Sequence, residues 1–291
     1  MSLVINHNLM AANAARNLST AYGQLSTSTS RLSSGLRITT AADDAAGLAV
    51  RELMRSDISS LAQGVRNAND AISLIQTADG ALSVIDEKLI RMKELAEQAA
   101  TGTYNSDQRL IIDSEYQAMA SEITRIANAT DFNGIYLLNG NLSGSTHNGS
   151  GLKSTGKLKV HFGTGNDSAE DYYYIQINKA TASALGVGLE AGNSISTQSL
   201  AQQSLAKLNN AIISKDKIRA SLGALQNRLE NTITTLEVQA ENLQAAESRI
   251  SDVDVATEMT EFVRTQILTQ AAVAMLSQAN SLPQMAMQLL G

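Results

Sequence analysis

Two adjacent aspartates, Asp43 and Asp44, are the residues of this sequence whose types and spacing most suggest a chemical role. Paired carboxylates can act as a catalytic acid and base or hold a metal ion. The same residues also fit the start of a helix, in which Thr40 is the cap and Asp43 returns the hydrogen bond. Acidic side chains in a first helical turn are favoured by the helix dipole. We therefore interpret the pair as a helix start.

Histidine and cysteine offer little support for catalysis. His7, His147 and His161 have unrelated spacings and form no H-E-x-x-H pattern, which argues against a metallohydrolase. The chain has no cysteine, so disulfides, thiolate nucleophiles and thiolate metal sites are excluded.

The loop "GTGND" at residues 163–167 has glycines but leads from one strand-like segment to another, so we interpret it as a hairpin turn and not as a phosphate-binding loop. Asp167, Glu170 and Asp171 follow without the spaced ligands of a calcium loop. A metal-dependent hydrolase built on these three carboxylates is the enzyme alternative. We expect no enzyme activity, no metal and no cofactor.

Composition favours long helices. Aromatic residues make up 3% of the chain, and a single proline, Pro283, interrupts it. The formal net charge of -6 gives no reason to expect binding to nucleic acid. No apolar run approaches the roughly 20 residues that cross a bilayer, and no cleavable signal peptide is visible, so we expect no membrane insertion.

Between residues 58 and 99, apolar residues recur at alternating steps of three and four, with Asp79 as the interruption. This spacing predicts a long helix with a coiled-coil seam. The series is Ile58, Leu61, Val65, Ala68, Ile72, Ile75, Leu82, Ile85, Leu89, Met92, Ala96 and Ala99.

A second seam recurs every seven residues near the other end of the chain, at Leu222, Leu229, Leu236, Leu243 and Ile250. A shorter helix is predicted at 106–129, with a Ser/Asp cap signal at its start. Both chain ends also have helical spacing and are expected to pair with each other. Their apolar positions include Leu18, Leu25 and Leu32 at the front and Ile267, Leu268, Ala271, Met275 and Ala279 at the back.

Residues 139–195 differ in character, because "KLKVHF" and "YYYIQIN" alternate like strands on either side of the turn. The predicted fold is therefore mainly α, a long antiparallel helical bundle or coiled coil formed by the N- and C-terminal halves, with a small β-hairpin insertion. The terminal segments are rich in Ser, Thr, Gln and Asn, so we expect weak helices that fold on docking.

The stretch "RLSSGLRITTAADDAAGLAV" at 31–50 closely resembles the N-terminal signature of bacterial flagellin. The segment "SRISDVDVATEMTEFVRTQILTQAAVAMLSQANSLPQ" is similar to its C-terminal signature, and "DFNGIYLLNG" at 131–140 adds to the match. The resemblance implies a structural subunit that polymerises into the helical flagellar filament for swimming motility. Compared with many flagellins this is a short form, whose middle offers about one hairpin in place of large outer domains.

The resemblance also implies a division into domains. Residues 1–34 and 257–291 would form an inner terminal coiled coil, and 35–256 a rod-like helical bundle. The rod would include joint segments 35–44 and 251–256 and the β-rich insertion 139–195. Leu18, Leu25, Leu32, Ile267, Leu268 and Met275 would serve the terminal coiled coil, and Ile72, Ile85, Leu89, Leu222, Leu229, Leu236 and Leu243 the rod seam.

The partners that the resemblance implies are further copies of the chain, the type III flagellar export apparatus, an export chaperone, the filament cap and the hook-filament junction proteins. The chain would be extracellular, in the flagellum. Arg91, Leu95 and Glu115 match positions through which a host Toll-like receptor recognises flagellin, although Lys93 stands where arginine is common. The alternative functions are a hook-filament junction adaptor and a cytoplasmic signalling coiled coil.

Overall fold

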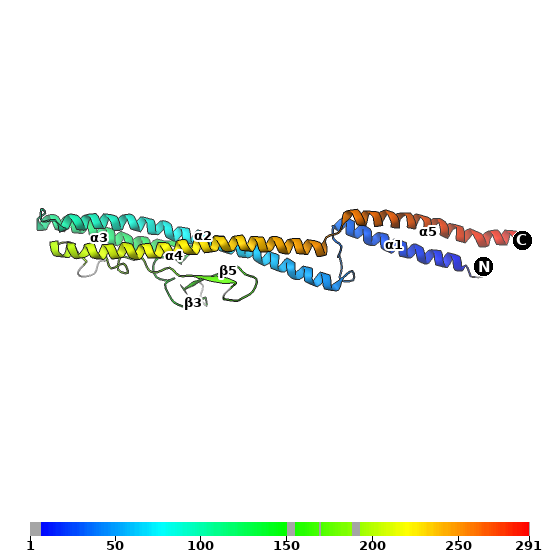
Figure 1. The fold of residues 1–291 in the computed structure, drawn as a ribbon, viewed down its shortest axis with the longest axis horizontal. Coiled ribbons are helices and arrows are strands. Elements are labelled where there is room, and N and C mark those ends of the chain that lie inside the picture. The colour runs from blue at the N-terminus through cyan, green and yellow to red at the C-terminus, as the bar shows by residue number, and fades with distance from the viewer. Residues whose placement is uncertain (1–6, 150–154, 169, 188–192, 291) are drawn as a thin grey trace. The chain divides into compact units, whose positions relative to one another are not determined.

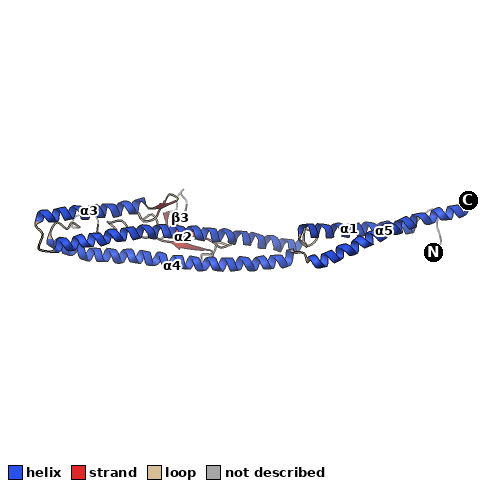
Figure 2. Ribbon diagram, turned by 90° about the horizontal axis from the view of Figure 1, so that it is seen from above, coloured by secondary structure: helices blue, strands red, loops and turns tan. Residues whose placement is uncertain are grey.

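The computed structural model describes the chain apart from residues 1–6, 150–154, 169, 188–192 and 291. The chain divides into two compact units. Unit 1 comprises residues 1–58 and 241–291, and unit 2 comprises residues 59–240. Long helices dominate both units (Figure 2).

The two ends of the chain pair within unit 1. Helix α1 (Leu9–Ser34) lies beside α5 (Val255–Leu290), as Figures 1 and 2 show. The helices are antiparallel, because Asn8 at the start of α1 donates to the carbonyl of Ala279, and Arg31 at its end lies 3.7 Å from the carboxylate of Glu258. The sequence prediction that the ends are mates is confirmed.

The segments that flank this pair are bonded to each other in unit 1. Gly35 ends α1 in the left-handed conformation, with φ of 74°, which glycine adopts without steric cost. Beyond it, Arg37 N–H donates to the Ser251 carbonyl at 2.7 Å and Val253 N–H donates to the Gly35 carbonyl at 3.0 Å. Residues 35–37 and 251–253 therefore form a short antiparallel pairing.

Helix α2 (Ala45–Ala100) starts later than the sequence suggested. Asp44 is the capping residue, since its carboxylate accepts from Gly47 N–H at 2.9 Å. The prediction of Thr40 as the cap is wrong: Thr40 donates its N–H and its hydroxyl to Asp43. These bonds make a turn ahead of the helix, so both aspartates serve local backbone structure.

Three helices meet in unit 2: α2, α3 (Ser106–Ala129) and α4 (Gln198–Ser251). The predicted helix at 106–129 and the two predicted long helices are confirmed. Asn105 caps α3 through a capping box with Gln108, one residue before the Ser/Asp signal. Apolar side chains from all three helices form one core, which includes Leu82, Ile85, Leu89, Met92, Tyr116, Ile123, Leu208 and Leu222.

The described part of the chain contains three antiparallel strand pairs, two of them inside the insertion at 139–195, where the sequence predicted one. The predicted hairpin pairs β5 (Leu158–His161) with β6 (Tyr172–Ile175), from Leu158 opposite Ile175 to His161 opposite Tyr172. The additional pairs are β1 (Asp131–Phe132) with β2 (Ile135–Tyr136) and β3 (His147–Asn148) with β4 (Thr155–Gly156). Strands this short give little alternation to read in a sequence.

Candidate assembly surfaces

The contact between α1 and α5 is made of small and hydroxyl side chains. Ala21, Ser28, Thr265, Thr269 and Ala279 are buried there, with exposed fractions of 0% to 7%. The threonines donate back to carbonyls of their own helix: Thr269 Oγ1 lies 2.8 Å from the Thr265 carbonyl oxygen. Because these hydroxyls are hydrogen-bonded within α5, burying them costs little and the two helices can approach closely.

The apolar residues that the sequence assigned to the C-terminal side of this pairing lie elsewhere. Ile267, Leu268 and Met275 are 59%, 45% and 63% exposed. The prediction that these three side chains pack against the N-terminal helix of the same chain is wrong, because Thr265 and Thr269 form the face of α5 that contacts α1. On α1, Leu18, Leu25 and Leu32 are half-buried. A role for all six in contacts between copies stays a prediction.

Apolar side chains are distributed around α5 instead of being gathered on one side. In addition to the three residues above, the large apolar side chains that are exposed in the described part of α5 are Val255, Met259, Val263, Val273 and Met285. A helix that is apolar all round is stable in water only when neighbours surround it. Within the described chain α5 has one helical neighbour, α1, so most of this surface is available to other molecules.

The outer side of α1 carries a shallow groove of about 500 Å³. It is lined by Tyr22, Leu25, Ser26, Thr29, Ser30 and Ser33. Tyr22 is 53% exposed. Short side chains flanking an aromatic and a leucine leave a depression into which larger apolar side chains of another helix would fit.

The seam residues of the two long helices mostly lie in the interior. Ile85, Leu89, Leu222 and Leu229 are at most 1% exposed and Leu236 is 6% exposed. Ile72 packs against the core of unit 2, and Leu243, in the unit 1 part of α4, is half-buried.

Ion pairs that sequence reasoning missed join α2 to α4 in unit 2. Asp79, the interruption of the apolar series, receives two hydrogen bonds from Arg219 at 2.7 and 3.1 Å. One helical repeat further along α2, Asp86 lies 2.6 Å from Lys215, whose side chain is 2% exposed. A buried lysine is stable only with such a partner, so these pairs fix which residues of the two helices face each other.

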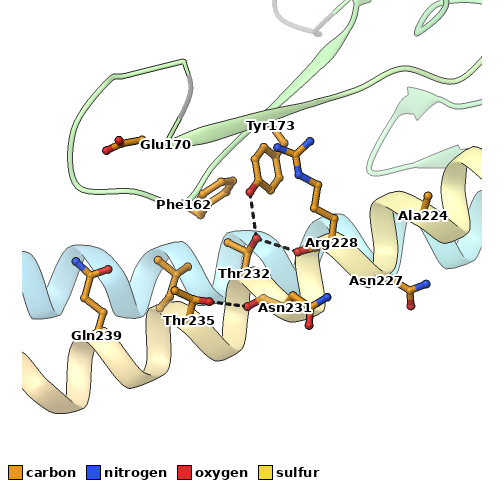
Figure 3. Close-up of a pocket in the computed structure, with 11 residues that line it drawn as sticks. Phe162, Glu170, Tyr173, Ala224, Asn227, Arg228, Asn231, Thr232, Thr235 and Gln239 are labelled. Atoms are coloured by element: carbon orange, nitrogen blue, oxygen red, sulfur yellow. Dashed lines mark hydrogen bonds between the residues drawn. The ribbon is translucent and has the colours of Figure 1, made fainter.

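The β5–β6 hairpin packs on α2 and α4 (Figure 3). The ring of Tyr173 lies under the Arg228 guanidinium at 3.6 Å, and Thr232 Oγ1 lies 3.4 Å from the Tyr173 hydroxyl. Phe162 meets the Tyr173 ring edge-on, with centroids 4.6 Å apart. The groove between hairpin and helix has a volume of about 570 Å³ and also carries Asn231, Thr235 and Gln239.

The acidic residues of the hairpin loop are engaged with their own backbone. The Asp171 carboxylate accepts from the N–H of Asp167 at 2.7 Å and from the N–H of Gly165 at 3.3 Å. Within the described residues there is no group of three or more potential metal ligands. The "GTGND" segment lies in the loop between β5 and β6, as the prediction of a hairpin turn requires.

The three residues assigned to receptor recognition differ in accessibility. Arg91 and Glu115 form an ion pair of 2.8 Å between α2 and α3, with side chains 48% and 45% exposed. The hydrogen bond that Arg91 donates to the Glu115 carboxylate is the main cause that raises the pKa of Arg91. Leu95 is 1% exposed and belongs to the core. A partner that binds folded unit 2 can therefore reach the ion pair but not the Leu95 side chain.

Both terminal regions of the chain match models of a known protein family. The family model described as bacterial flagellin N-terminal helical region matches residues 5–143, and that of the bacterial flagellin C-terminal helical region matches residues 205–290. The chain belongs to the bacterial flagellin family.

Similar flagellins match along their whole length. A flagellin of Halalkalibacterium halodurans is 43% identical over 99% of this chain and 100% of that protein. The flagellar filament 33 kDa core protein of Treponema phagedenis is 42% identical over the same shares. A hook-associated flagellar protein of Vibrio parahaemolyticus has a TM-score of 0.56, covering 72% of this chain and 100% of that one. At 15% identity, this last similarity concerns the fold alone.

None of the helices in the described part of this flagellin family member is both long and apolar enough to cross a membrane.

Proposed function

We propose that the terminal helices of this structural subunit of the flagellar filament drive its polymerisation. The observation that carries the proposal is α5, which has apolar side chains on all sides and one helical partner in its own chain. Each added subunit would cover this surface with helices of its neighbours, so removal of apolar surface from water would be the driving force.

The terminal helices would gain much of their order in this step. Helix α1 contains many serines and threonines, whose hydroxyls donate to carbonyls of the preceding turn, as Thr20, Thr27 and Thr29 do. Such residues form helices weakly on their own. Residues 1–34 and 257–291 would accordingly be the inner coiled-coil domain, and residues 35–256 the rod-like domain around it. Folding of the ends would be coupled to assembly.

The contacts would join different surfaces of neighbouring copies. The apolar sides of α5 and the groove beside Tyr22 on α1 are distinct, so one copy can offer each to a different neighbour. Contacts of this head-to-tail kind give open helical polymers when the rotation does not close a ring. Motor rotation of such a filament would produce thrust without any cofactor or enzyme activity.

Before polymerisation the apolar surface of α5 would require protection. We infer an export chaperone that covers the C-terminal segment, export through the type III flagellar apparatus, and insertion under a filament cap. Junction proteins would connect the filament to the hook. The mature location would be extracellular, in the flagellum.

A host Toll-like receptor would contact folded unit 2 around Arg91 and Glu115, whose side chains are accessible.

Truncation tests the proposal. Variants lacking residues 1–30 or 262–291 should stay soluble and helical but fail to elongate short filament seeds, whereas the full chain should form long filaments under the electron microscope. Long filaments from either truncated chain would contradict the role of the ends. Failure of the full chain to extend competent seeds would favour the junction adaptor, which forms only a short zone.

A further inference from the structure

The aromatic residues of this chain are few, and three of its seven tyrosines lie on one hairpin. Aromatic residues make up 3% of the sequence, yet Tyr172, Tyr173 and Tyr174 are consecutive in β6. Val160 and Ile175 are buried at 7% and 0% exposure and mark the inner face of the sheet. The alternation of strand residues places Lys159, His161, Tyr172 and Tyr174 on the opposite face.

These outward side chains contact one another. The rings of Tyr172 and Tyr174 meet edge-on with centroids 5.4 Å apart, and His161 stacks on Tyr172 at 6.0 Å. His147 of β3 lies 6.0 Å from Tyr174. The hydrogen bond between the two tyrosines raises the pKa of Tyr174. We call His147, Lys159, His161, Tyr172 and Tyr174 the aromatic platform.

The platform carries a cation and no carboxylate. Lys159 Nζ lies 3.7 Å from the centre of the Tyr172 ring and donates to Asn166 Oδ1 at 3.1 Å. In the described part of the chain, no carboxylate forms an ion pair with Lys159. The Asp171 carboxylate is bonded to backbone N–H groups, and Glu170 lines the groove on the α4 side (Figure 3).

We propose that the aromatic platform binds acidic polysaccharide, with a sugar ring lying against Tyr174 and a uronate carboxylate beside Lys159, which Tyr172 holds in place. The faces of aromatic rings are electron-rich and attract the polarised C–H groups of a sugar ring. Tyrosine hydroxyls and histidine nitrogens can both donate to and accept from sugar hydroxyls, and the ammonium of Lys159 retains a donor for a carboxylate. The site needs only the folded hairpin, so it does not depend on polymerisation.

Other classes of partner fit this face less well. The platform has no aliphatic side chain, whereas the centre of a stable protein interface is largely apolar. Nucleic acid would require phosphate contacts from several cations, whereas the platform carries one lysine, Lys159. Tyr174 is 40% exposed, so its ring is available to a ligand that binds at the surface.

Affinity electrophoresis of the full-length monomer in gels containing polygalacturonate tests the proposal. Dextran serves as the neutral polysaccharide and single-stranded oligo(dT) as a polyanion with stackable bases. Lys159→Gln removes the cation, and Tyr174→Thr removes a ring while keeping a residue that strands favour. Lys217→Gln, at an exposed position of α4, makes the same charge change as Lys159→Gln outside the platform.

We expect polygalacturonate to retard the chain more than dextran or oligo(dT) does. Lys159→Gln and Tyr174→Thr should each weaken this binding roughly fivefold or more, while Lys217→Gln leaves it unchanged. Tyr172→Phe, which keeps the ring, should retain binding. Unchanged binding in Lys159→Gln would overturn the proposal even if Tyr174→Thr unfolded the hairpin. An equal loss in Lys217→Gln, or equal retardation by dextran or oligo(dT), would overturn it as well.

Discussion

Gly64 of α2 lies directly against the backbone of Phe162 at the end of the β5–β6 hairpin. A β-carbon at Gly64 would be 2.0 Å from the carbonyl oxygen of Phe162. One turn further along α2, Asn67 Nδ2 donates to the carbonyl of His161 at 2.8 Å. The hairpin therefore approaches the helix backbone at the only side-chain-free position of that turn, and it is held there by a hydrogen bond.

Gly64→Ala should consequently destabilise unit 2. Alanine forms helices better than glycine by about 1 kcal/mol, but the clash is with backbone and cannot be relieved by a rotamer change, so we expect a net loss of about 1–3 kcal/mol. Gly80→Ala is the matched control, because no atom lies within 4 Å of a β-carbon at that exposed position of the same helix. It should stabilise the chain slightly. Urea denaturation measures both, and a gain in Gly64→Ala would contradict the packing described.

Lys215→Met should reduce the free energy of unfolding by about 1–3 kcal/mol. It removes a buried cation and leaves Asp86 and Asp216 without the partner that each has at 2.6 and 2.7 Å. The two carboxylates are partly exposed, which keeps the loss below that of a fully buried pair. Lys217→Met, two residues away and exposed, should change stability by less than about 0.5 kcal/mol. Equal losses in the free energy of unfolding for the two substitutions would contradict a stabilising role of the Lys215 ion pairs.

Asp43 should titrate far below an ordinary aspartate. The hydrogen bond from the backbone N–H of Thr40 and those from Thr39 lower its pKa from 3.8 to about 2. Because the unfolded chain binds this proton more readily, the contribution to stability is present above about pH 4 and is lost as the pH falls towards 2. Carboxyl-carbon NMR on the folded chain should give a midpoint near 2, with Asp43→Asn identifying the signal. A midpoint near 3.8 would mean that these bonds do not persist in solution.

Substitution of Arg91 should affect receptor recognition, whereas substitution of Leu95 should affect folding stability. Arg91→Ala removes an ion pair that is screened by solvent, so it should leave stability nearly unchanged while lowering the response of a Toll-like receptor reporter. Leu95→Ala should cost about 2–5 kcal/mol, because it leaves a cavity in the core. Its effect on the receptor should therefore accompany a lower unfolding temperature. Loss of the response in Leu95→Ala at unchanged stability would contradict the burial of this side chain.

Local signals predicted the elements whose formation depends on local sequence. The predicted helix at 106–129 coincides with α3. Its start could be predicted because the capping residues Asn105 and Gln108 lie next to it in the sequence. The long seams were visible because large apolar residues such as Ile85, Leu89 and Leu222 recur in one stripe that enters the core.

The parts that the sequence did not reveal depend on contacts between distant segments. The face of α5 that meets α1 was missed because apolar residues surround this helix, so periodicity selects no side. Thr265 and Thr269 form that face only because small residues of α1, Ala21 and Ser28 among them, permit close approach. Similarly, nothing near Gly64 in the sequence indicates that Phe162 will lie against it.

Seeded elongation of a paired substitution on α5 tests the central claim most directly. Val263→Asn combined with Ile267→Asn removes apolar surface that is 45% and 59% exposed in the single chain. Gln266→Asn combined with Gln270→Asn is the matched control, with the same helical spacing and exposed polar positions. Both proteins should be monomers of unchanged helical content. We predict that the control extends filament seeds as the natural sequence does and that the Val263/Ile267 variant does not. Filaments of normal length from that variant would contradict burial of α5 between copies as the force that builds the filament.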